Sequence, residues 1–175
     1  MKKFWFQVMA LLILTFTGLY FYSHPQVLQN FNLPSFSQSS SSPTQIRIID
    51  SSQPGSETVE STISIEVADS AEKRSRGLSD RTSLASDSGM LFVYDKPSQY
   101  KFWMKGMQFP LDFIWILNDT IVDLLPNIAN PAPNTQTQDL SILAPTTQVN
   151  KILEVNAGFI AAHNIKIGDK LQLIK

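Results

Sequence analysis

The sequence predicts an α+β domain, mostly of antiparallel β-strands in a compact, barrel-like sheet with two short helices, preceded by one transmembrane helix. Stretches with strand-like alternation outnumber helical ones. Most of the connections between them are short, which favours antiparallel pairing. A long uncharged run near the N-terminus adds the membrane-spanning segment.

The N-terminal run predicts an uncleaved membrane anchor over residues 1–22. Lys2 and Lys3 precede the uncharged residues 4–22, which would rise about 28 Å as a helix, close to the roughly 30 Å of a hydrocarbon core. The positive end should stay in the cytoplasm, which leaves the rest of the chain outside it. A cleaved signal peptide is the alternative, but bulky aromatics rather than a small-residue cleavage site follow Thr17.

Residues 23–45 predict a flexible linker, because they are rich in serine and proline and cannot bury a core. Residues 46–175 remain as one globular domain. Without Lys2 and Lys3, the chain's 14 basic and 15 acidic residues become 12 against 15, a net charge of −3. This balance argues against nucleic acid as a partner. The absence of cysteine excludes disulfides, zinc–thiolate sites and cysteine nucleophiles.

Two helices are expected in the domain. Asp69 fits an N-cap with Glu72 at the third helical position, and Gly77 fits the end of that helix. Asn156 fits the N-cap of a second short helix. The strands are expected at residues 46–49, 62–67, 90–94, 100–105, 111–117, 120–125, 151–155 and 171–174.

The stretch 126–148 is polar, contains four prolines and is too long to be a mere connection. It is predicted to be either a functional flap or an ordered excursion over the surface.

Asp112 is the most informative charged residue of the domain. Apolar residues fall on both faces of strand 111–117, which predicts that the Asp112 carboxylate is buried. A buried carboxylate needs a cation or backbone donors, and Arg76 or Lys105 could supply the cation. The alternative is a structural role, as a buried ion pair or as a carboxylate that fixes the turn after Pro110.

Three further observations concern a binding surface. Lys101, Trp103 and Lys105 alternate onto one face of their segment, which places an indole between two ammonium groups. Such a surface suits a ring with an anionic group, although the lysine stems could simply cover an exposed indole edge. Glu154 precedes the second helix and is expected to be poorly solvated; alternatively, it faces the amides of that helix.

His24 and His163 are the only histidines, so no Ser-His-Asp triad and no histidine-based metal site can be assembled. We therefore expect no metal, no cofactor and no catalytic residue.

Seven short motifs occur in order along the domain and closely resemble the bacterial and archaeal family known as domain of unknown function 192. The resemblance runs from about residue 63 to residue 173 and implies a compact, mostly antiparallel β domain that is often exported, with no established activity. The motifs are Glu66-Val67-Ala68-Asp69, Arg76-Gly77-Leu78, Gly89-Met90-Leu91-Phe92-Val93, Phe102-Trp103-Met104-Lys105, Pro110-Leu111-Asp112, Leu153-Glu154 with Gly158, and Ile165-Lys166-Ile167-Gly168-Asp169.

Two departures from the family pattern limit what the resemblance implies. Family members often have cysteines in the segment that matches residues 126–148, and this chain has none. No redox or metal role of such a pair is therefore transferred. Ser79 stands where many members have methionine.

The leading hypothesis is a membrane-tethered, non-catalytic binding module outside the cytoplasmic membrane, for a small polar or anionic ligand or an envelope glycan. Its candidate ligand-binding residues are Arg76, Trp103, Lys105, Asp112 and Glu154, with Asp112 organising the cations. One alternative is a hydrolase, for example of a glycosidic bond, that uses Asp112 and Glu154 as a carboxylate pair. Another is an envelope assembly or scaffolding protein that docks partners through residues 126–148.

Overall fold

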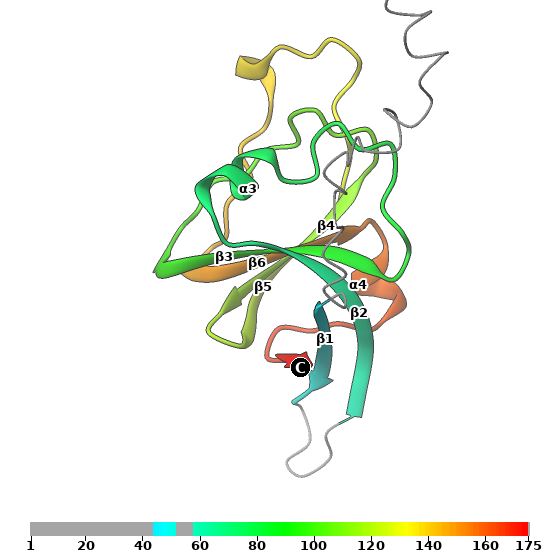
Figure 1. The fold of residues 1–175 in the computed structure, drawn as a ribbon, viewed down its shortest axis with the longest axis vertical. Helices are drawn as coiled ribbons and strands as arrows, with labels where there is room; N and C mark the ends of the chain where they lie inside the picture. The colour runs from blue at the N-terminus through cyan, green and yellow to red at the C-terminus, as the bar shows by residue number, and fades with distance from the viewer. Residues whose placement is uncertain (1–43, 52–57, 175) are drawn as a thin grey trace, which may run out of the picture. The chain divides into compact units, whose positions relative to one another are not determined.

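Seven strands close into a barrel in the computed structural model, which describes residues 44–51 and 58–174 (Figure 1). The strands are β1 (Thr44–Asp50), β2 (Thr58–Ala68), β3 (Ser88–Ser98), β4 (Leu111–Leu117), β5 (Thr120–Ile128), β6 (Val149–Asn156) and β7 (Lys170–Ile174). They follow one another around the barrel as β1-β2-β3-β6-β4-β5-β7. All neighbouring strands are antiparallel except β2 and β3, which are parallel.

The helices are short: α3 (Ala71–Arg76), α4 (Phe159–Ala162) and the 3₁₀ turn η1 (Thr137–Asp139). The mostly antiparallel barrel with two short α-helices confirms the fold class expected for the domain. The predicted anchor 1–22 and residues 23–43 of the predicted linker lie outside the described residues. Thr44 and Gln45, which were also assigned to the linker, belong to β1. Within the described part of the chain, no helix combines the length and the apolar character needed to cross a bilayer.

Gly77 ends α3 as expected, with φ of 53°, but both predicted N-caps were wrong. Ser70, not Asp69, caps α3, because its side-chain oxygen accepts a hydrogen bond from the Lys73 amide at 3.2 Å. Asn156 belongs to β6, and its side-chain amide donates to two carbonyls of the 84–85 loop. Gly158, with φ of 88°, takes the cap position of α4 instead, a conformation that glycine adopts without strain.

Two hydrophobic clusters cover the two faces of the sheet. The inner cluster fills the barrel with residues from all seven strands and α4, among them Ile114, Leu153 and Val155. The outer cluster lies beneath the segments that cross β3, β4 and β6, and includes Phe92, Phe113 and other large side chains. Figure 1 shows α3 and the long segment before β6 on the same side of β3 and β6. This double burial explains why β4 and β6 are apolar on both faces.

The segment between β5 and β6 is an ordered excursion over this outer face. Leu143 forms an antiparallel bridge with Phe102, with both hydrogen bonds at 2.8 Å. Gln99 donates from its side chain to the carbonyls of Pro145 and Thr146, at 3.2 Å each. The Thr146 amide and hydroxyl donate to Asp123 at 2.8 and 2.9 Å.

Asp112 holds the barrel to its second helix. Its side chain is fully buried, as expected, and it accepts three backbone hydrogen bonds: Oδ1 from the amides of Asn127 and Gly158 at 2.7 and 3.1 Å, and Oδ2 from the amide of Ile160 at 2.9 Å. One carboxylate thereby ties β4 to the end of β5 and to the start of α4. The role of Asp112 is structural, but Arg76 and Lys105 are not among its partners, and the donors come from β5 and from the start of α4 rather than from the turn after Pro110.

The substitution Asp112→Asn should lower the free energy of unfolding by about 2–4 kcal/mol. The side-chain NH₂ of asparagine would face at least one backbone N–H, so that two donors would oppose each other. That buried backbone N–H would then have no hydrogen-bond acceptor. Urea unfolding followed by circular dichroism measures the change. Asp95→Asn is the control, because Asp95 is exposed and should change stability by less than about 0.5 kcal/mol. Equal effects of the two substitutions would contradict this role.

Candidate functional site

A cavity of about 200 Å³ opens on the outer face of the barrel, between α3, β3 and the segment 99–109. Four of the five predicted site residues line it: Arg76 from α3, Trp103 and Lys105 from the segment 99–109, and Glu154 from β6. The fifth, Asp112, is not among the lining residues.

One wall of the cavity is the segment 99–109, which is not a strand. The expected strand 100–105 was wrong, because within this segment only Phe102 makes a bridge. The expected alternation is nevertheless present: Phe102 and Met104 are buried, while Trp103 and Lys105 are exposed. Packing of the buried residues against the outer cluster is enough to turn the others to solvent.

Two hydrogen bonds fix the end of this wall to the turn after α3. The Ser79 hydroxyl donates to the Lys105 carbonyl at 2.8 Å, and the Asp80 amide donates to the Gly106 carbonyl at 2.9 Å. Ser79, the residue that departs from the family pattern, thus supports the backbone that carries Lys105.

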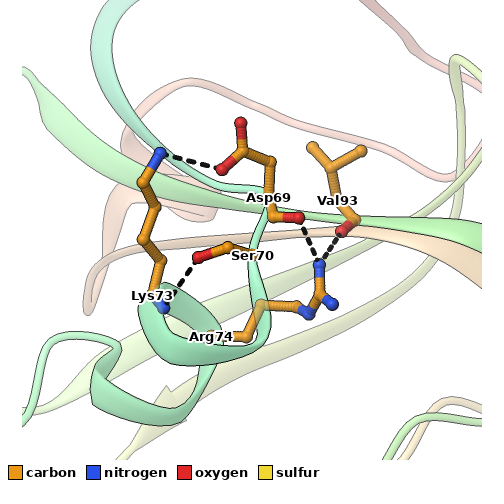
Figure 2. A network of polar contacts seen from close by, with 5 residues as sticks. All are labelled: Asp69, Ser70, Lys73, Arg74 and Val93. Carbon is orange, nitrogen blue, oxygen red and sulfur yellow. Dashed lines mark hydrogen bonds and ion pairs between the residues drawn. The ribbon is translucent and has the colours of Figure 1, made fainter.

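The opposite wall is α3, and Arg74 fastens it to the barrel. Its guanidinium donates at 2.8 Å to the carbonyls of Asp69 and of Val93 in β3, as Figure 2 shows. It also lies over the Tyr94 ring, 4.7 Å from the centroid. Lys73 pairs with the Asp69 carboxylate at 2.8 Å beside the Ser70 cap (Figure 2). α3 has no buried residue, so these polar contacts, together with Leu78 just beyond it, position the helix.

The rim of the cavity carries an exposed indole and several cations. Trp103 is 51% exposed, although a large indole usually buries most of its surface. Lys105 Nζ lies 6.0 Å from the centroid of the Trp103 ring. Arg76 pairs with Glu72 at 3.3 Å, and such a highly exposed pair contributes little stability and breaks easily in favour of another anion.

Glu154 lies deep in the same cavity. It is 5% exposed, and none of the described residues makes a hydrogen bond or ion pair with its carboxyl group. Among the described residues, every side-chain nitrogen or oxygen that is completely buried has a hydrogen-bond partner. The Glu154 oxygens have none, so they are not completely buried and face the open space of the cavity. Burial raises the pKa of Glu154 from 4.5 to about 8, so the carboxyl group is mostly protonated at neutral pH.

Three charged or titratable residues of the lining were not among the predicted site residues: Arg74, Tyr94 and Lys101. Alternation along β3 carries the signal for Tyr94, because Met90, Phe92 and Tyr94 share one face. Burial raises the pKa of Tyr94, and the nearby Glu154 carboxyl group adds a smaller increase.

Asp112 and Glu154 lie on opposite faces of the sheet. Asp112 is paired with Val155 across β4 and β6, and Glu154 with Phe113. Directly opposed residues share a face and neighbours along a strand alternate, so Asp112 points into the barrel and Glu154 out of it. The two cannot act on one bond, and the carboxylate-pair hydrolase is excluded. The contact with the α4 amides that was considered for Glu154 is made by Asp112.

The arrangement offers little to a hard metal ion. Across residues 44–51 and 58–174, no three His, Asp or Glu side chains converge as ligands would. The cavity can instead offer an aromatic face, cationic donors and one protonated carboxyl group.

Solved structures of two other proteins share this fold. One is from Sinorhizobium meliloti 1021 and was proposed to be a transcription regulator; it is 27% identical, and the match covers 74% of this chain and 92% of that one, with a TM-score of 0.64. The other, from Novosphingobium aromaticivorans DSM 12444, is of unknown function; it is 26% identical, with coverages of 73% and 83% and a TM-score of 0.62. No curated protein matches the chain.

The sequence profile of domain of unknown function 192, described as an uncharacterized ACR, matches residues 53–173. The match takes in both walls and the floor of the cavity, and it covers more than half of the chain. The chain therefore belongs to the domain of unknown function 192 family.

Proposed function

We propose that this protein is a membrane-tethered, non-catalytic binding module whose outer cavity takes a small polar or anionic ligand, free or as part of an envelope glycan. The observation that carries the proposal is the half-exposed Trp103 beside Lys105, above a cavity that ends at an unpartnered Glu154. An exposed indole can stack on the apolar face of a ring.

The charges of the cavity favour a ligand with an anionic group. Arg76, Lys101 and Lys105 contribute cations to the lining, whereas Glu154 is mostly neutral at pH 7 because of its raised pKa. The volume of about 200 Å³ is below the roughly 300–1,000 Å³ of pockets for drug-sized ligands. A single ring, or one ring of a longer glycan, fits this size.

The proposed location rests on the N-terminal sequence. Two lysines followed by nineteen uncharged residues are typical of an anchor whose following domain lies outside the cytoplasmic membrane. The part of the predicted linker that precedes β1, residues 23–43, would span about 25 Å as a flexible coil, which keeps the cavity within about one domain diameter of the bilayer.

Binding should depend on the indole and on the rim charge. The experiment titrates sugar acids and sugar phosphates into the full chain in micelles and measures binding by calorimetry. At least one of these compounds should bind the wild-type protein. Trp103→Ala should weaken it about tenfold or more and Lys105→Ala about three- to tenfold, as expected for lost stacking and one exposed charge contact.

Ile167→Ala and Lys170→Ala are the matched controls, since both positions are exposed and outside the cavity. They should bind as wild type does. If no sugar acid or sugar phosphate binds, or if well-folded Trp103→Ala binds them all unchanged, the proposed function is wrong.

The buried Glu154 should make stability depend on pH. Its pKa is about 8 in the folded state against 4.5 as the ordinary value. Between these values the folded protein holds a proton that the unfolded chain has released, so the free energy of unfolding falls as pH rises and levels off above about pH 8. The total loss should be on the order of 5 kcal/mol.

Urea unfolding of wild type and Glu154→Gln at pH 5.5, 6.5, 7.5 and 8.5 tests this expectation. The Gln variant cannot ionise, so the difference between the two proteins should grow with pH in favour of Gln. Glu72→Gln, at an exposed carboxylate, should follow wild type. A constant difference between wild type and Glu154→Gln over this range would refute the buried, protonated state.

The anchor makes a separate prediction for cells. The full chain should stay in the membrane pellet after an alkaline carbonate wash, because a membrane-spanning helix is not held by charge. A variant without residues 1–22 should appear in the soluble fraction. Release of the full chain by the wash would contradict the anchor and leave the cavity proposal untouched.

A further inference from the structure

The Glu154 carboxyl group has no hydrogen-bond or ion-pair partner among the described residues, in a place where polar groups normally have one. It sits on β6 between β3 and β4, with Met90 and Phe113 as its directly opposed neighbours. Neither neighbour offers a strong hydrogen-bonding group, and leaving a buried polar group unbonded is costly. The remaining direction is the cavity, so a ligand is the natural source of a donor for this acid.

The acid and the cations of the cavity lie at two depths. Tyr94 lies further along the same face of β3 and lines the same cavity, and no charged or titratable group faces Glu154 from β4. The cations lie toward the opening, on α3 and on the segment 99–109. They are Arg74, Arg76, Lys101 and Lys105.

None of these cations forms an ion pair with Glu154 within the described residues, and two of them are engaged elsewhere. Arg74 is engaged by two carbonyls, and Arg76 by Glu72. Lys105 lies beside the indole and forms no ion pair within the described residues. The cavity therefore presents an acid at its floor, an aromatic face on one wall and available positive charge at its mouth.

We infer that the ligand of this cavity is a zwitterionic sugar-sized molecule, whose protonated amine binds Glu154 and whose anionic group binds Lys105 and its neighbouring cations. This inference rests on the proposed function and names its ligand class. The Trp103 indole would stack on the ring that joins the two charged groups. An ammonium group satisfies a buried carboxylate far better than a hydroxyl group does, because the hydrogen bond is charge-assisted.

The inference predicts a proton that leaves the protein. Glu154 is mostly protonated in the free protein, and its proton must depart when the carboxylate pairs with an ammonium group. A ligand that is only anionic would leave the proton on Glu154, because an ionised Glu154 carboxylate would repel an anion. The number of protons released on binding therefore separates the two ligand classes.

Glucosamine 6-phosphate and glucose 6-phosphate form the matched probe pair, since they differ by one amine and share the phosphate and the ring. Calorimetry of the full chain at pH 6.5, in buffers with different ionisation enthalpies, measures affinity and proton release. Glucosamine 6-phosphate should bind at least tenfold more tightly, and its binding should release about one proton more per complex than that of glucose 6-phosphate.

Variants separate the roles of the residues. Glu154→Gln should abolish both the preference and the extra proton while glucose 6-phosphate still binds. Trp103→Ala should weaken both ligands by a similar factor, and Lys170→Ala should change nothing. A fragment of N-deacetylated peptidoglycan, compared with its N-acetylated form, is a second arm that distinguishes a glycan chain from a free sugar; a preference for the amine form in either arm supports the inference.

Equal affinities with equal proton release would overturn the inference, whereas the proposed function would stand if glucose 6-phosphate binding still required Trp103. Preference for the amine that survives in Glu154→Gln would also overturn it, since the amine would then bind elsewhere. If neither sugar phosphate nor either glycan form binds, the zwitterion inference fails, and the remaining sugar acids decide the proposed function separately.

Discussion

The pairing of β6 between β3 and β4 is the constraint on which the rest of the structure depends. It buries the strand on both faces, so its side chains alternate between the barrel interior and the outer cluster. One register then assigns the buried acids of β4 and β6 to different tasks. Asp112 turns inward to three backbone amides, and Glu154 turns outward to a cavity. A shift of β4 by one residue would turn Asp112 away from the barrel interior and from its three amides.

The two acids show how differently the same group can be stabilised in an interior. Asp112 is surrounded by donors that the backbone supplies, so its burial strengthens the link between β4 and α4. Glu154 has apolar neighbours on both adjoining strands and avoids the cost of a buried charge by keeping its proton, as its raised pKa indicates. An interior acid without donors weakens a fold, and its place in a cavity lined by an indole and cations is consistent with a role in binding.

Alternation made much of the architecture predictable. β4 was expected at its observed bounds, and the burial of Asp112 followed from apolar residues on both of its faces. The outward positions of Trp103 and Lys105 were also expected, although their segment is not a strand. The partners of the acids could not be predicted, because they depend on a register between β4 and β6 that is set by contacts 40 residues apart in sequence. The N-cap of α3 was misplaced because Asp69 and Ser70 are both good N-cap residues and only the local backbone decides between them.

Closure of the barrel has a consequence for molecules held side by side. Each described strand has a hydrogen-bonded neighbour on both sides, although β5 and β7 meet only through Thr120 and Lys170. A strand that is open along its whole length can recruit strands from other copies. Where proposed anchors would hold many copies close together, the closed order of the described strands offers no such fully open strand to a neighbouring molecule.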